Sequence, residues 1–129
     1  MGSFGNHLED EILDHVFGNG TYAAPTIYIA LSTADPTDDA SGIAEPSGNG
    51  YARKACAGWD VSSSGATANT ADITFDQATG SWGTITHFAI FDALTSGNML
   101  AHGTLSAQKV VGNGDTVKFA AGDLDVTLD

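Results

Sequence analysis

Short strand-like segments recur along most of this sequence, and that recurrence restricts the chain to a mainly β fold. In residues 84–91 apolar side chains fall on both faces of an alternating pattern, as expected for a central, covered strand. Residues 26–32 are rich in β-branched and aromatic side chains and follow a proline. Further strands are expected at residues 51–57, 71–75, 99–105, 108–111, 116–120 and 124–128.

Turn residues separate these segments, so the connections are short and the pairing should be mostly antiparallel. Residues 61–70 fit either a loop or a weak edge strand. In the last segment Leu124, Val126 and Leu128 share one face, which predicts a half-buried strand. The pattern predicts an antiparallel β-sandwich, jelly-roll-like, of about seven or eight strands.

Residues 6–17 show helical rather than strand periodicity. Their apolar side chains form one stripe: Leu8, Ile12, Leu13, Val16 and Phe17. Asn6 and Glu9 have the spacing of a capping box, and Gly18 is a typical helix stop. A helix this short needs packing to be stable, so the stripe must pack on its own domain or on a neighbouring subunit.

The chain is organised as a single β-sandwich domain over residues 1–129. Residues 1–20 form a helical N-terminal arm, and residues 33–50 form a long loop that contains Pro36 and Pro46. A loop of this length in a small domain is either a functional or assembly segment or a mobile surface loop.

Charge limits the partners. Four Lys and Arg residues stand against 16 Asp and Glu residues, giving a formal net charge of -12. Nucleic acids and anionic membranes attract basic proteins, so neither is expected as a partner. No apolar run is long enough to span a bilayer, and the first residues lack a signal peptide. The single cysteine, Cys56, excludes an intrachain disulfide.

No motif for catalysis, metal binding or cofactor binding is present. The four histidines lack metal-ligand spacing, and no serine sits in a nucleophile elbow. The acids Asp35, Asp38, Asp39 and Glu45 miss the spacing of a calcium loop. Trp59 and Trp82 flank strands and are candidates for the core, an interface or carbohydrate contact. The sequence therefore predicts no enzyme, no metal and no cofactor.

Several segments together resemble a family of small virion proteins of tailed bacteriophages. They are "LEDEILDHVFG" (8–18), "YIALSTADP" (28–36), "GNGYAR" (48–53), "ADITF" (71–75), "WGTITHFAIFD" (82–92) and "VKFAAGDLDVTL" (117–128). Each segment alone has little specificity, but their order along nearly the whole chain is distinctive.

The resemblance implies a non-catalytic virion component, made in the host cytoplasm and added to the head or tail. A compact, acidic domain with a helical arm favours a capsid decoration (cement) protein that binds the major capsid protein, as a homotrimer. The alternative is a tail fibre, minor tail or baseplate component involved in attachment, which binds tail proteins. The interface is expected to use seven apolar residues: Leu8, Ile12, Leu13, Val16, Phe17, Trp59 and Trp82.

Overall fold

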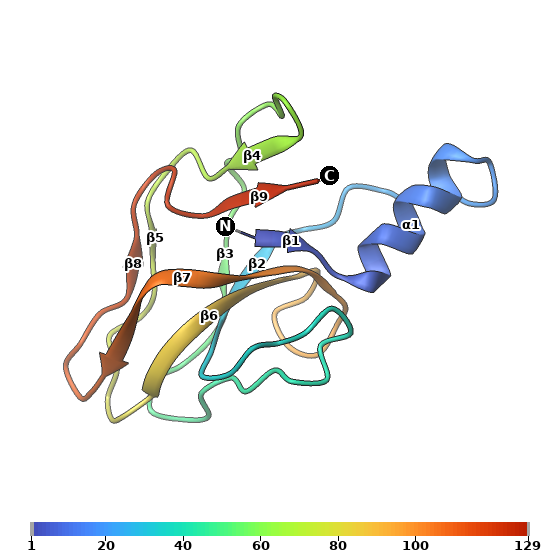
Figure 1. Ribbon diagram of the computed structural model, residues 1–129. Coiled ribbons are helices and arrows are strands. Elements are labelled where there is room, and N and C mark those ends of the chain that lie inside the picture. Colours follow the sequence, from blue (N-terminus) through green and yellow to red (C-terminus); the bar gives the residue numbers. More distant parts are fainter. Residues whose placement is uncertain (1, 129) are drawn as a thin grey trace.

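The computed structural model describes residues 2–128 and shows a mainly β fold from which one helix projects (Figure 1). In chain order the elements are β1 (Gly2–Phe4), α1 (Asn6–Val16), β2 (Tyr28–Ser32), β3 (Lys54–Ala55), β4 (Ala66–Ala68), β5 (Ile73–Thr74), β6 (Gly83–Phe91), β7 (Met99–Val111), β8 (Lys118–Phe119) and β9 (Asp125–Thr127).

Most strands belong to one curled sheet with the order β3-β2-β6-β7-β1-β9-β4, and β5 pairs with β8 in a smaller sheet. Within residues 2–128, β1 and β9 form the one parallel pair. The predicted sandwich-like, antiparallel β fold with one helix is confirmed.

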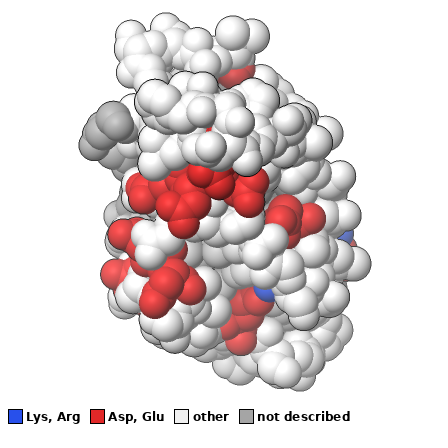
Figure 2. All heavy atoms as spheres, turned by 90° about the vertical axis from the view of Figure 1, so that its right-hand side faces the viewer, with Lys and Arg blue, Asp and Glu red and all other residues white. Residues whose placement is uncertain are grey.

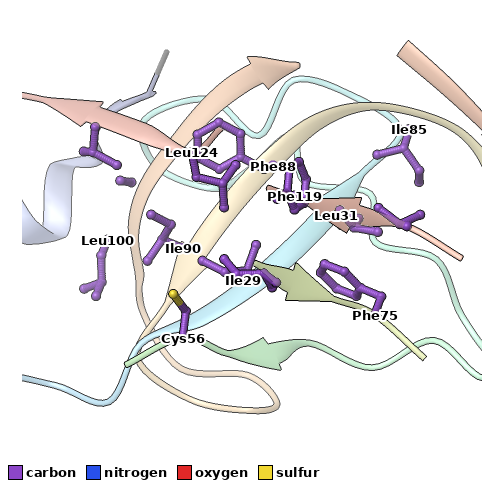
Figure 3. Packing of buried hydrophobic residues seen from close by; sticks show 14 of the residues in the cluster. Ile29, Leu31, Cys56, Phe75, Ile85, Phe88, Ile90, Leu100, Phe119 and Leu124 are labelled. Carbon is purple, nitrogen blue, oxygen red and sulfur yellow. The ribbon is translucent and has the colours of Figure 1, made fainter. Parts of the chain in front are cut away.

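The strand β6 lies inside this sheet, between β2 and β7, and is covered on both faces. On one face Ile85, Phe88 and Ile90 join the main core, which Figure 3 shows in close view. On the other face Ala89 and Phe91 pack with a smaller cluster that includes Met99. Residues 84–91 carry apolar side chains on both faces because both faces of the strand are buried, as the sequence predicts.

Aromatic side chains connect the small sheet to the large one. Phe75, which follows β5, lies 6.3 Å from Phe119 of β8 between ring centroids. Tyr51 stacks on Phe75 and meets Trp82 edge to face, with centroids 5.3 Å apart. These rings close one end of the core.

Several strands differ from their predicted extents. Of residues 51–57, only β3 pairs in the sheet, and Arg53, which precedes it, has a buried side chain. The two strands expected at 99–105 and 108–111 are one strand, β7. The break between them is nevertheless visible as a bulge, since His87 pairs with Thr104 whereas Ile85 pairs with Lys109.

The ends of the chain also differ from the sequence prediction. β1 was not predicted, because three residues that begin with Gly and Ser carry almost no strand signal. Residues 66–68 form the edge strand β4, which settles the alternative left open for residues 61–70. Leu124 and Val126 are buried as predicted, but Leu128 is 49% exposed because it follows the last paired residue of β9.

The predicted helix is confirmed, but its start is one residue earlier than the capping box implies. Gly5 is the N-cap, and no side chain caps the helix. The N–H of Glu9 donates to the carbonyl oxygen of Gly5 (3.2 Å), so the helical hydrogen bonds begin at Gly5 and Asn6 is the first helical residue. The N–H of Asn6 donates to the carbonyl oxygen of Asp38 (2.9 Å), outside the helix. At the other end Gly18 follows the cap with φ of 80°, as expected for a glycine stop.

The loop of residues 33–50 is held to the sheet at several points. Thr33 N–H donates to the carbonyl of Ala44, and Ala44 N–H donates to the buried hydroxyl of Ser32. At its far end Asn49 accepts a hydrogen bond from the indole of Trp82 (2.8 Å) through its carbonyl oxygen.

The main attachment of this loop is an ion pair between a buried arginine and a half-buried glutamate. Arg53 is 8% exposed, and its guanidinium forms two hydrogen bonds with the carboxylate of Glu45, at 2.8 and 3.0 Å. The same guanidinium donates to the carbonyls of Ala93 and Ser96 and lies 3.7 Å above the ring of Phe91. Every nitrogen of this guanidinium therefore donates a hydrogen bond within the domain.

Candidate assembly interface

The helix α1 and the segment that follows it, residues 6–27, project from the sheet (Figure 1) and are called the arm from here on. The arm expected at residues 1–20 therefore differs at its start, because residues 2–4 pair in the sheet as β1. Leu8 is the buried side chain of the helix and attaches its first turn to the core. Ile12, one turn further, packs partly against the same core. Beyond Ile12 the helix leaves the body of the domain.

Three apolar side chains near the far end of the helix have no cover. Leu13 is 55% exposed, Val16 65% and Phe17 72%. Exposure of apolar side chains to water is unfavourable, and full burial of one such side chain contributes about 1.5–3 kcal/mol relative to full exposure. A cluster of them at the tip of a projecting element is typical of a contact surface for another molecule.

An apolar groove of about 190 Å³ lies at the base of the arm. Its walls come from the arm and from the sheet: Phe4, Leu8, Ile27, Trp59, Thr67, Ile90, Leu100, Ala101 and Val126. No charged side chain lines it. Because Leu8, Ile12 and Val16 repeat every four residues, the apolar stripe runs from this groove along the helix to its tip.

Acidic side chains border the stripe. Glu9, Asp10 and Asp14 are exposed on the helix, and Glu11 is half-buried. Figure 2 shows the side of the molecule onto which the arm projects, where Asp and Glu atoms gather in broad groups and Lys and Arg atoms occupy small spots. The exposed apolar tip therefore sits in a strongly negative field.

The basic side chains of the domain are mostly engaged elsewhere. Arg53 pairs with Glu45, Lys54 with Asp76 at 2.7 Å, and Lys118 with Asp72 at 3.0 Å. The Lys118 ammonium and a backbone hydrogen bond from Ala121 hold the pKa of Asp72 below its usual value. Arg53, Lys54 and Lys118 therefore pair with acids of the body of the domain and not with the acids of the arm.

The junction between arm and body contains an unsatisfied polar group. Within residues 2–128, the buried hydroxyl of Tyr22 has no hydrogen-bond partner. Burial raises the pKa of Tyr22, and the carboxylates of Asp92 and Glu11 raise it further. The backbone N–H of Tyr22 donates to His15 Nδ1 at 3.3 Å, which ties the returning segment to the helix. The arm is thus less completely bonded than the loop of residues 33–50.

The structure separates the seven predicted interface residues into three groups. Leu13, Val16 and Phe17 are exposed, as an interface requires. Ile12 and Trp59 are half-buried, and Trp59 lines the groove. Leu8 and Trp82 belong to the core of the single chain. The interface role of the exposed residues stays a prediction, and Trp82 has a structural role as a partner of Asn49.

Two contributors to this surface were not found in the sequence. Phe4 lies in β1, which was not predicted, because a three-residue strand is too short to show a period. Pairing of β1 with β7 brings Phe4 opposite Ala101 in the groove floor. Ile27, the last residue of the arm, lies in the segment predicted as a strand, but nothing in the sequence assigns it to this groove.

The groups considered for chemistry do not assemble into a reactive centre in the described part of the chain. No cluster of three His, Cys, Asp or Glu side chains with metal-binding geometry occurs within residues 2–128. His102 Nε2 contacts Asp38 Oδ1 at 2.8 Å, which joins β7 to the loop beside the helix start. Across the β6–β7 hairpin, His102 pairs with Ala89, whereas His87 pairs with Thr104.

The lone thiol is also in a structural environment. Cys56 is buried in the core, and burial raises the pKa of its thiol. Arg53 and Lys54 point to Glu45 and Asp76. Within residues 2–128, no helix has the length and hydrophobicity needed to cross a bilayer.

Comparison with known protein families gives a match over almost the whole chain. The model of the family described as "Podophage GP4 fiber I protein gp80" matches residues 3–127. The chain belongs to this family. It is therefore a structural protein of a bacteriophage virion, as the resemblance seen in the sequence implies. A comparison with curated proteins finds no match. The gp80 family match covers the arm, the groove and the core alike.

Proposed function

We propose that this gp80 family protein is a non-catalytic fibre component of the virion tail and is attached to other virion proteins through its arm. The observation that carries the proposal is the projecting helix with three uncovered apolar side chains, Leu13, Val16 and Phe17. The word "fiber" in the family description supports the location.

The attachment follows from the energetics of the arm. A short helix is marginal in water, and here only its first turns pack on the domain. Burying the remaining stripe against a second surface stabilises both the helix and the assembly. The groove at the base of the arm, with Trp59 on one wall, extends the same apolar surface.

Capsid decoration is the second candidate, and the shape of the domain favours it. Residues 2–128 form one compact β unit without a repetitive shaft, and the surface beside the arm is acidic, which suits the outer side of a DNA-filled shell. In this role the domain binds the major capsid protein across subunit boundaries. A homotrimer fits a three-fold site in either location.

Electron cryomicroscopy of the purified virion tests the location. Density for this domain confined to the tail supports the fibre proposal. Density repeated over the head lattice overturns it in favour of decoration. Light scattering of the purified protein tests the homotrimer, because a trimer has three times the mass of the 13.2 kDa chain.

A second experiment tests attachment through the arm. Infected host cells express a tagged copy of the protein, and the number of tagged copies per purified virion is measured. We expect the double substitution Leu13→Ser and Phe17→Ser to abolish incorporation. The matched control, Val61→Ser with Leu94→Ser, also removes two exposed apolar side chains and should incorporate normally. Equal incorporation of both variants contradicts a role for the arm.

A further inference from the structure

We infer that the arm docks on a partner whose surface combines an apolar ridge with flanking Lys or Arg side chains, and that this partner is a different virion protein rather than a second copy of this chain. The inference rests on the attachment proposed above. It adds the chemistry of the partner, which the family description does not give.

The apolar ridge follows from the shape of the docking surface, which we define as the groove at the base of the arm together with the exposed side chains of Leu13, Val16 and Phe17. The groove has no charged lining, so a polar group placed in it would lose its hydration without compensation. An elongated apolar element that places one side chain in the groove and others along the helix satisfies the whole surface.

The flanking cations follow from the position of the acids. Glu9 and Asp10 lie one helical turn from Leu13, and Asp14 lies one turn from Phe17. Any molecule that covers these apolar side chains therefore approaches the carboxylates closely. A neutral or acidic partner would dehydrate them or repel them, whereas Lys or Arg would pair with them.

A second copy of this chain does not meet that requirement. Each copy has only four Lys and Arg residues and a formal net charge of -12. Of those four side chains, Arg53, Lys54 and Lys118 already form ion pairs with acids of their own domain. Two arms placed together would instead bring their carboxylates into contact, and like charges across an interface are unfavourable.

Incorporation of tagged variants into virions tests this inference separately from the attachment itself. Asp14→Lys reverses one charge beside the docking surface, and Asp60→Lys makes the same change at an exposed site off the arm. Both variants change the net charge equally, so a difference between them reports the local field. We expect Asp14→Lys to reduce the tagged copies per virion about tenfold and Asp60→Lys to leave them unchanged.

Washing purified virions at increasing NaCl concentration gives an independent result. Tagged wild-type protein should be released more readily as salt rises, because ion pairs at the rim are screened.

The outcomes are distinguishable. If Leu13→Ser with Phe17→Ser fails to incorporate while Asp14→Lys matches Asp60→Lys, the attachment stands and the basic partner is wrong. If the purified protein self-associates and Phe17→Ser disrupts that association, the partner of the arm is a second copy and the inference is overturned. If all these variants incorporate like the wild type, both proposals fail.

Discussion

The loop of residues 33–50 is irregular but firmly attached to the domain, whereas the arm of residues 6–27 contains a regular helix but projects from it. The loop has no strand or helix, yet hydrogen bonds and an ion pair hold it along its length. The arm contains the one helix of residues 2–128, yet it projects with apolar side chains uncovered. Regular backbone hydrogen bonding therefore does not measure how firmly a segment is held, because side-chain partners decide that.

The contrast is sharpest at two tyrosines. The hydroxyl of Tyr51 donates to Glu45 at 2.7 Å and accepts the N–H of Leu31 at 3.0 Å. The hydroxyl of Tyr22, at the junction of the arm, is buried without a partner in the described structure. Within residues 2–128, the loop side of this comparison has its hydroxyl fully bonded, whereas the arm has an unpaired buried hydroxyl and three exposed apolar side chains.

The largest expected effect comes from removing the cation under the loop. Arg53→Ala leaves the Glu45 carboxylate and the carbonyls of Ala93 and Ser96 without their partner. Loss of one member of a buried pair lowers the free energy of unfolding by about 3–5 kcal/mol. Denaturant unfolding measures it. Lys54→Ala, which removes an exposed pair with Asp76, should cost about 1 kcal/mol or less, and equal losses would show that the loop is not specially held.

Acid should loosen the loop through Glu45. Burial opposes its ionisation, but hydrogen bonds from Arg53 and Tyr51 and the charge of Arg53 outweigh burial and hold the pKa below the usual 4.5. The folded state thus binds this proton less readily than the unfolded chain. The resulting stability is present above pH 4.5 and is lost as the pH falls through the lowered pKa.

Glu45→Gln sharpens that expectation. The amide still accepts hydrogen bonds but carries no charge beside Arg53, so the free energy of unfolding at neutral pH should fall by about 2 kcal/mol. Unfolding curves measured from neutral to acid pH should then decline less steeply than those of the wild type. An unchanged slope would exclude Glu45 as a source of acid sensitivity.

Replacing tyrosine by phenylalanine should change the free energy of unfolding in opposite directions in the two regions. Tyr51→Phe removes a hydroxyl with two partners and should destabilise the domain by about 2 kcal/mol. Tyr22→Phe removes a buried hydroxyl with none and should stabilise it by about 1 kcal/mol. Thermal unfolding of the two variants provides the measurement. A destabilised Tyr22→Phe variant would mean that the hydroxyl has a partner in solution.

The smallest expected effect lies at the tip of the arm. Phe17→Ser should change the free energy of unfolding by no more than about 0.5 kcal/mol, because the ring is 72% exposed. In the same helix, Leu8→Ala empties a core position and should cost about 2 kcal/mol or more. Denaturant unfolding of both variants compares the first turn of the helix, which packs on the core, with its exposed end. Similar losses would show that Phe17 packs on its own domain.

The sequence predicted the parts of the fold that have a period. Residues 84–91 carry two apolar faces and became β6, and the stripe of residues 8–16 became α1. β1, and the meeting of Phe4 with Ile27 in one groove, were beyond sequence reasoning, since they depend on which distant strands pair. The ion pair of Arg53 with Glu45 was not predicted, because the loop segment between the two residues carries no pattern.

The apolar stripe of the helix was predicted, but the burial of its individual side chains was not, for a similar reason. An amphipathic stripe shows that five side chains avoid water, but it does not divide them between the domain and a partner. That division depends on the angle at which the helix leaves the sheet. The structure buries Leu8, half-buries Ile12 and leaves the others exposed.

The parallel pairing of β1 with β9 has a mechanical consequence. Gly2 lies opposite Val126 and Ser3 opposite Thr127, while β7 holds the other edge of β1. Tension applied at Gly2 and at Thr127 pulls the two strands in opposite directions along their length. Their hydrogen bonds are then strained together, as in shear, instead of opening one after another as in a zipper. The joint at which the arm begins is thus oriented to resist a pulling force.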